Sequence, residues 1–130
     1  MIAFDSSGLI KLVVLEAETV ALRSWLEERP GSPWVASELC RVELPRAVAR
    51  LNPAAAPQSR ALLAGLDLQP VTATLLDLAS TLGPPALRSL DAIHLASVLA
   101  LDSDLEAFVV YDERLAAAAA AAGIPVAQPR

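Results

Sequence analysis

The chain has 130 residues, which is enough for one hydrophobic core but would leave two separate domains near the lower size limit. Hydrophobic residues make up 55% of the sequence and charged residues 19%, which excludes a disordered tail and a linker-like or collagen-like protein. The formal net charge of −5 argues against binding nucleic acid through charge alone, although a divalent cation held by carboxylates would offset part of it.

The sequence predicts no membrane-spanning helix, because such a helix needs roughly 20 apolar residues. The longest charge-free stretch, residues 115–129, is interrupted by Gly123 and Pro125. The first residues lack the basic and apolar segments of a signal peptide. Cys40 is the only cysteine and has no internal disulfide partner, so we expect a cytoplasmic protein.

The apolar pattern predicts short strands that alternate with helices along the whole chain. In chain order, strands are expected at residues 2–4, 34–36, 68–71, 107–111 and 124–126. Strands separated by helices are typical of an α/β fold, in which a central, mostly parallel sheet is covered by helices on both faces.

The helices are predicted from apolar periodicity and from capping residues. A first helix should follow a cap at Ser6 or Ser7, and the others are expected at residues 16–28, 37–51, 59–66, 73–82 and 90–101, with an alanine-rich one ending at Ala122. Ser37 and Thr72 are the expected caps of the helices that begin there, and Pro45 should kink the third helix. Residues 52–57 should form a loop, and Gly123 should end the last helix.

Four acidic residues stand in apolar surroundings. Asp5 and Asp112 each follow a predicted strand, Glu43 interrupts the apolar stripe of a helix, and Asp91 begins the most apolar helix. Ligands bind beyond the carboxyl ends of the strands in folds of this kind, which is where Asp5 and Asp112 are expected. Four neighbouring carboxylates would repel one another unless a divalent cation lay among them. The pattern therefore indicates a Mg²⁺ or Mn²⁺ site, since these ions prefer oxygen ligands.

Each of these acids also has a purely structural interpretation. Asp5 and Asp91 could cap helices, and Asp112 could be an ordinary acidic residue at a helix start. Glu43 could form an ion pair with Arg46 or Arg50 of its own helix. The metal-site interpretation depends on all four acids being considered together.

Several segments resemble the PIN domain, and specifically the VapC-type toxins of bacterial toxin–antitoxin pairs. The resemblance covers almost the whole chain, and its segments are residues 4–7, 37–47, 87–96, 110–115 and 121–124. It implies a single PIN-like domain over residues 1–130, with a three-layer α/β/α fold around a mostly parallel sheet. The family often has Thr or Ser two residues before the last acid, but here that residue is Val110, so the hydroxyl contact is missing or comes from elsewhere.

The resemblance implies a metal-dependent endoribonuclease that hydrolyses RNA phosphodiester bonds. By position, Asp5, Glu43, Asp91 and Asp112 would be the catalytic residues, and Asp5 and Asp91 the direct ligands of Mg²⁺, with Mn²⁺ as an alternative. Glu43 would orient a water on the metal or complete its coordination, and Asp112 would act through water or a second ion. His94 is the only histidine, so attack by water is favoured over cleavage through the ribose 2′-hydroxyl.

The resemblance also implies partners: an RNA substrate, a VapB-like antitoxin that covers the acidic site, and a second copy of the chain in a homodimer. No membrane partner is expected. Three other classes of protein are alternatives to the toxin. The first is a PIN-like RNA-processing nuclease without an antitoxin. The second is a catalytically inactive interaction module, which the departure at Val110 leaves open, and the third is a phosphoacceptor receiver domain. The receiver domain needs a lysine late in the chain, whereas the only lysine is Lys11.

The remaining candidate residues are predicted to be mainly structural. We expect Ser6 or Ser7 to cap a helix rather than to contact the acids, and His94 to be a buried residue that donates a hydrogen bond. Cys40 should pack in the core, and Glu38 should lie in the first turn of a helix. Three arginines could contact RNA phosphates near the site or could be ordinary surface charges: Arg41, Arg46 and Arg88. Asp102 is expected in a polar loop outside every segment of the resemblance.

Overall fold

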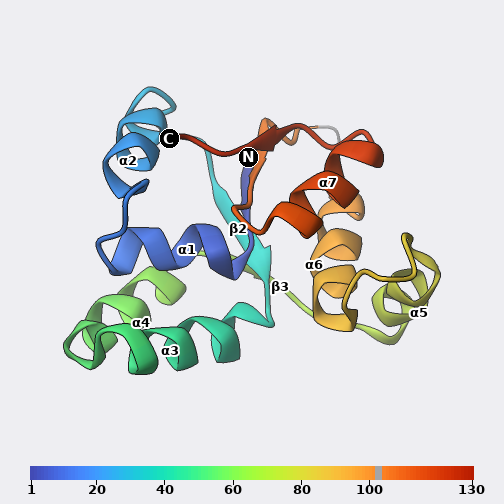
Figure 1. Cartoon of the computed structure of the whole chain (residues 1–130), viewed down its shortest axis with the longest axis horizontal. Helices are drawn as coiled ribbons and strands as arrows, with labels where there is room; N and C mark the ends of the chain where they lie inside the picture. Colours follow the sequence, from blue (N-terminus) through green and yellow to red (C-terminus); the bar gives the residue numbers. More distant parts are fainter. Residues whose placement is uncertain (102–103) are drawn as a thin grey trace.

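The computed structural model describes residues 1–101 and 104–130, so the polar loop expected around Asp102 falls partly outside the described residues. The described residues form one five-stranded sheet in which all neighbouring strands are parallel, in the order β3-β2-β1-β4-β5. The strands are β1 (Ile2–Phe4), β2 (Trp34–Ser37), β3 (Asp67–Gln69), β4 (Ala107–Val109) and β5 (Val126–Ala127). The sheet confirms the predicted parallel arrangement (Figure 1).

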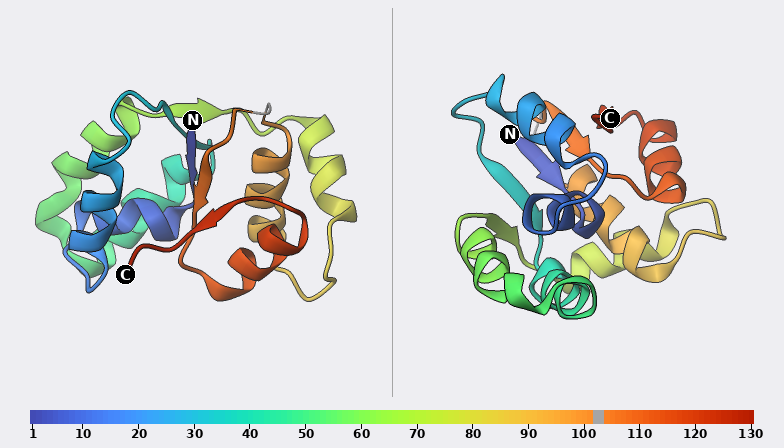
Figure 2. Two further views of the ribbon diagram at one scale, coloured as in Figure 1. Left: turned by 90° about the horizontal axis from the view of Figure 1, so that it is seen from above. Right: turned by 60° about the vertical axis from the view of Figure 1, so that its left-hand side comes forward.

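Helices cover both faces of the sheet. They are α1 (Ser6–Val13), α2 (Thr19–Glu27), α3 (Cys40–Leu51), α4 (Ala56–Ala64), α5 (Ala73–Thr81), α6 (Ser89–Leu99) and α7 (Glu113–Ala121), with a 3-10 turn at Pro53–Ala55. Figure 1 and the left view of Figure 2 show α1 to α4 on one side of the strands and α5 to α7 on the other. This arrangement confirms the predicted three-layer α/β/α fold.

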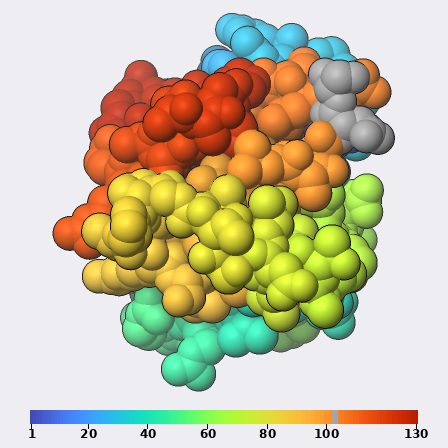
Figure 3. Space-filling model, turned by 90° about the vertical axis from the view of Figure 1, so that its right-hand side faces the viewer, coloured from blue at the N-terminus to red at the C-terminus, as the bar shows by residue number. Residues whose placement is uncertain are grey.

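The alternation of side chains along β1 explains the three layers. Ile2 and Phe4 pack in one buried cluster with α1, α2 and α3, whereas Ala3 between them packs in a second cluster with α6 and α7. All three residues are at most 1% exposed, so the strand is buried on both faces, as expected for a central parallel strand. The helix α5 packs on the outside of α6 and covers that side of the molecule (Figure 3).

The predicted elements are all present, but several boundaries differ from the expectation. The loop predicted at residues 52–57 is wrong in part, because it contains the 3-10 turn and the start of α4. The third helix begins at Cys40 rather than at Ser37, since β2 continues through Ser37. The cap predicted at Thr72 is confirmed by its side chain, which accepts a hydrogen bond from the Leu75 amide.

Two helix ends depend on single residues. The first helix is capped by Asp5, whose side chain accepts a hydrogen bond from the Gly8 amide, so the cap predicted at Ser6 or Ser7 is wrong. Gly123 follows the last helix with a φ of +82°, in the left-handed region that glycine adopts readily, which confirms that it ends this helix. Among the described residues, the helices are too short or too polar to span a bilayer.

The position of β1 determines where a site can form. It pairs with β2 on one side and β4 on the other, with Phe4 opposite Ala36 and Val109. Asp5, the residue after Phe4, therefore lies at the carboxyl edge of the sheet between β2 and β4. The first turn of α1 packs tightly there, because a Cβ atom added to Gly8 would lie 2.8 Å from the Val109 carbonyl oxygen.

Candidate active site

Asp5 is the most buried of the four acids, with 4% of its surface exposed. Its Oδ1 accepts hydrogen bonds from the Ser7 hydroxyl at 2.6 Å and from the Gly8 amide at 3.0 Å. Burial raises the pKa of the Asp5 carboxyl to about 6, even though the hydrogen bond from Ser7 lowers it. Asp5 therefore caps α1, as its structural interpretation predicted, and also presents a carboxylate at the carboxyl end of the central strand.

The hydroxyl of Ser7 connects Asp5 to the end of β4. It donates to Asp5 and accepts from the Tyr111 amide at 2.8 Å and the Asp112 amide at 3.3 Å. The expectation that this serine caps a helix rather than contacting the acids is wrong. Val110 itself is fully buried in the core, so the hydroxyl next to the last acid is supplied by Ser7 from the other end of the sequence.

Glu43 contacts His94 across two helices that lie far apart in the sequence. The Oε1 of Glu43 on α3 lies 2.5 Å from the Nε2 of His94 on α6. Burial lowers the pKa of His94, but the hydrogen bond and the charge of Glu43 raise it, and the net result is a pKa above the ordinary value. His94 is only 2% exposed, which confirms the prediction of a buried, hydrogen-bonded histidine. No ion pair joins Glu43 to an arginine among the described residues.

Asp91 lies in the first turn of α6, and it is not the residue that caps this helix. The capping position is taken by Arg88, so the structural interpretation of Asp91 as a cap is wrong. Burial raises the pKa of Asp91, and the negative charges of Asp112 and Glu43 raise it further, while His94 and Arg88 lower it. Asp91 therefore lies close enough to Asp112 and Glu43 for their charges to act on it.

Asp112 is exposed and caps α7 through a hydrogen bond from the Leu115 amide to its Oδ1 at 2.9 Å. It therefore serves as a helix cap and, at the same time, lies near enough to Asp91 to raise the pKa of that carboxyl. The structural interpretation of Asp112 as an acid at a helix start is therefore confirmed, and the same residue also lies near Asp91.

The four acids reach one region from four different parts of the chain. Asp5 follows β1, Glu43 is on α3, Asp91 is on α6 and Asp112 follows the strand β4. A positive charge close to these acids would favour the ionised forms of buried Asp5 and of Asp91, whose pKa values are both raised. Carboxylate oxygens are the ligand type that a hard divalent cation such as Mg²⁺ or Mn²⁺ prefers, although in the part of the chain that the structure describes no three of these acids bring their oxygens within 4.8 Å of one another.

A second donor set overlaps this region and was missed from the sequence. The ligand atoms of Cys40, Glu43 and His94 all lie within 4.8 Å of one another. Burial raises the pKa of the Cys40 thiol well above its usual range, and the charges of Glu43 and Asp5 raise it further, so the thiol stays protonated. Cys40 is fully buried and packs in the core, as predicted, and the carboxylates are the better ligands for a hard cation.

The contacts that His94 and Ser7 make to the acids were not predicted, and the sequence signals for them differ. His94 is three residues after Asp91 on one helix, a spacing that places both side chains on the same face, so its proximity to the acids was open to prediction. The role of Ser7 left no comparable pattern. Glu38 lies in the turn before α3 rather than in its first turn, and it is exposed.

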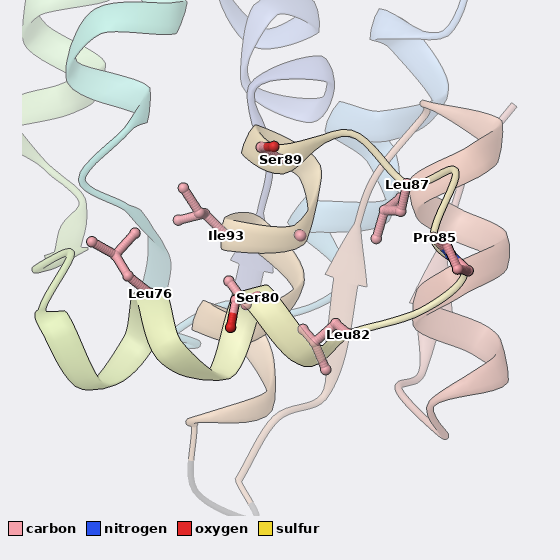
Figure 4. Close-up of a pocket in the computed structure, with 9 residues that line it drawn as sticks. Leu76, Ser80, Leu82, Pro85, Leu87, Ser89 and Ile93 are labelled. Atoms are coloured by element: carbon pink, nitrogen blue, oxygen red, sulfur yellow. The ribbon is translucent and has the colours of Figure 1, made fainter.

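The described residues also form hollows beside and away from the acids. One of about 460 Å³ has Ser7, Glu43 and Arg46 in its lining and so adjoins the acid cluster. Another, of about 470 Å³, lies between α5 and α6, and its lining includes Leu76, Ser80, Leu82, Pro85, Leu87, Ser89 and Ile93 (Figure 4). None of the four acids lines that second hollow, so it is separate from the candidate active site.

Comparison with known proteins identifies the family. A family model described as PIN domain matches residues 2–121 of the chain. The chain therefore belongs to the PIN-domain family. This finding confirms the first part of the resemblance drawn from the sequence.

The relatives place the chain more narrowly within that family. It is 46% identical to Ribonuclease VapC47 of Mycobacterium tuberculosis over 99% of this chain and 97% of the relative. It is 44% identical to Ribonuclease VapC46 of the same species over 98% of this chain and 97% of the relative. It is 41% identical to Ribonuclease VapC35, also of that species, over 99% of this chain and 97% of the relative. These similarities confirm the VapC-type resemblance.

The fold is shared with a solved structure of lower sequence similarity. The crystal structure of Mycobacterium tuberculosis VapC20, described as a sarcin-ricin loop cleaving toxin, matches with a TM-score of 0.77 at 18% identity. The match covers 99% of this chain and all of that one. It supports the assignment of the three-layer fold.

The connection through Ser7 predicts a specific loss of stability. Ser7→Ala should lower the free energy of unfolding by about 1–3 kcal/mol, because it leaves the Tyr111 amide without its acceptor and removes a donor from buried Asp5. Urea denaturation at pH 7 measures this change. Ser6→Ala is the matched control, since the Ser6 hydroxyl makes no hydrogen bond within residues 1–101 and 104–130. Equal effects of the two substitutions would contradict the structural role of Ser7.

Proposed function

We propose that this chain is a metal-dependent endoribonuclease and the toxic component of a toxin–antitoxin pair, with residues 1–130 forming one PIN-like catalytic domain. The observation that carries the proposal is the convergence of four acids at the carboxyl edge of a parallel sheet. Its relatives over nearly the full length are named ribonucleases, and this supports RNA as the substrate class.

Asp5 and Asp91 are the proposed ligands of the cation, which is Mg²⁺ or Mn²⁺. When bound, the ion supplies positive charge that stabilises the developing charge on the scissile phosphate and lowers the pKa of water. Asp5 is suited to this role because its position is determined by two hydrogen bonds and a short connection to β1. Asp91 is partly exposed at the start of α6, so its carboxylate is accessible from solvent.

Glu43 and Asp112 complete the proposed site. His94 holds one oxygen of Glu43, which leaves the other carboxylate oxygen to orient water or a ligand of the ion. Asp112 is held at the helix start by its capping bond and adds negative charge close to Asp91. His94 is buried against Glu43, so it is poorly placed to act on a ribose 2′-hydroxyl. Hydrolysis by water is therefore the proposed reaction.

Two alternatives from the sequence remain to be distinguished from this proposal. A catalytically inactive interaction module would use Asp5 only as the cap of α1, and it would cleave no RNA. An RNA-processing nuclease without an antitoxin would use the same acids, and only its partners would differ. RNA cleavage distinguishes the inactive module from the nucleases, and growth with and without a neighbouring gene product distinguishes the two nucleases.

The first experiment removes single charges from the proposed metal site. Asp5→Asn and Asp91→Asn should each reduce cleavage of a mixed RNA pool at least ~100-fold in Mn²⁺, because metal-stabilised transition states contribute several kcal/mol. Mn²⁺ should raise the melting temperature of the wild-type protein, because a ligand that binds only the folded state stabilises it. The same addition should raise the melting temperatures of the variants by less. Glu43→Gln should behave like Asp91→Asn, and Asp112→Asn should be milder.

The matched control is Asp77→Asn, which removes one exposed carboxylate from α5. It should leave cleavage and melting temperature unchanged. Wild-type rates in the Asp5 and Asp91 variants, or an equal loss in the Asp77 variant, would mean that the four-acid site is not the active site.

The proposed partners are an RNA substrate, a VapB-like antitoxin that covers the acidic site and a second copy of the chain, with the cytoplasm as the compartment. Expression of the chain alone should arrest bacterial growth, and co-expression with the small gene beside its own should restore growth. Asp5→Asn should be harmless in the same assay, because it lacks activity. Unimpaired growth with abundant wild-type protein and no partner would argue for a nuclease without an antitoxin.

A further inference from the structure

One face of α3 extends away from the acid cluster and carries two arginines. Glu43, Arg46 and Arg50 follow one another at spacings of three and four residues, so they lie along one side of the helix. All three line the hollow of about 460 Å³ beside the site. At about 1.5 Å per residue, Arg46 lies about 4.5 Å and Arg50 about 10.5 Å beyond Glu43 along the helix axis.

The opposite wall of this hollow comes from α1, which packs beside α3 (Figure 1). Ser6, Ser7 and Ile10 line it, and Ser7 is also the residue whose hydroxyl contacts Asp5. The hollow is therefore continuous with the acid cluster rather than separate from it.

The charge of the two arginines is available to a ligand. Both side chains are exposed, and neither forms an ion pair in the part of the chain that the structure describes. The chain as a whole carries a net charge of −5, so two adjacent cations beside an acidic site stand out against their surroundings. Guanidinium groups bind phosphate through two parallel hydrogen bonds.

The rim of the hollow is apolar and unusually exposed. Val42 is 61% exposed, Leu51 56% and Leu90 50%, and all three line the hollow together with the arginines. A free phosphate would gain nothing from these side chains, whereas a nucleotide has both a phosphate and the apolar face of a base. The combination of two cations with an apolar rim therefore fits a nucleotide chain.

We propose that Arg46 and Arg50 bind phosphates of the nucleotides that flank the scissile bond, with the neighbouring bases against Val42, Leu51 and Leu90. This inference rests on the proposed ribonuclease function and identifies the surface along which the RNA substrate lies. It makes α3 both the carrier of Glu43 and the positioning element for the strand to be cut.

The test compares steady-state cleavage of a single-stranded RNA oligonucleotide in Mn²⁺ by wild-type protein and by Arg46→Ala and Arg50→Ala. Each variant should raise KM about 10-fold and change kcat less than about 2-fold. A 10-fold change is at the lower end of the range for losing a charge-assisted hydrogen bond, because both arginines are exposed. The dependence of log(kcat/KM) on log salt should become shallower by about 0.7 for each arginine removed. The matched control is Arg23→Ala, an exposed arginine on α2, which should leave both quantities unchanged.

The outcomes separate this inference from the proposed function. If wild-type protein does not cleave RNA, the ribonuclease proposal fails and this inference fails with it. If wild-type protein cleaves and the α3 variants keep its KM and salt dependence, the proposed function stands and the RNA surface is wrong. The same conclusion follows if those variants weaken only neutralisation by the antitoxin, since the hollow would then bind a protein. Melting temperatures equal to wild type exclude misfolding as the cause of a raised KM.

Discussion

The buried carboxylate of Asp5 is the constraint on which the rest of the site depends. It lies at the carboxyl end of the central strand, where burial raises its pKa from 3.8 to about 6. That increase corresponds to about 3 kcal/mol by which the folded protein disfavours the ionised group. This cost is what remains after two hydrogen bonds, from Ser7 and from Gly8, have already lowered the pKa. A cation bound between Asp5 and Asp91 would offset it, so a costly feature of the fold becomes the basis of the proposed chemistry.

The surrounding contacts organise the other acids around Asp5. The Ser7 hydroxyl joins the end of β1 to the backbone after β4, so the two strand ends that carry Asp5 and Asp112 are held together. His94 crosses from α6 to α3 and holds Glu43. The positive charge that Glu43 favours on His94 also lowers the pKa of Asp5 and Asp91, so this histidine reduces the repulsion within the cluster.

The fold and the four acids were predictable from the sequence because they depend on local patterns and one topological rule. Asp5 and Asp112 each follow an apolar strand, and the carboxyl ends of parallel strands lie at the same edge of a sheet, so both acids were expected there. The partners of Ser7 and His94 were not predicted, because these contacts span 104 and 51 residues of sequence. The contact of Ser7 depends on how closely α1 approaches β4, which the absence of a side chain at Gly8 permits. Similarly, a polar Ser37 suggested a helix cap, yet pairing with Gln69 of β3 extends β2 through it.

In the proposed reaction, clustered carboxylates and a divalent cation activate water to hydrolyse RNA. The chemical ends of the products test this reaction most directly, because water and the ribose 2′-hydroxyl leave different pairs of ends. RNA cleaved by the purified protein in Mn²⁺ should carry 5′-phosphate and 3′-hydroxyl ends, and chelation of the metal should abolish their formation. Products with 5′-hydroxyl and 2′,3′-cyclic phosphate ends, formed equally well in chelator, would show that the ribose 2′-hydroxyl is the nucleophile and would contradict the account.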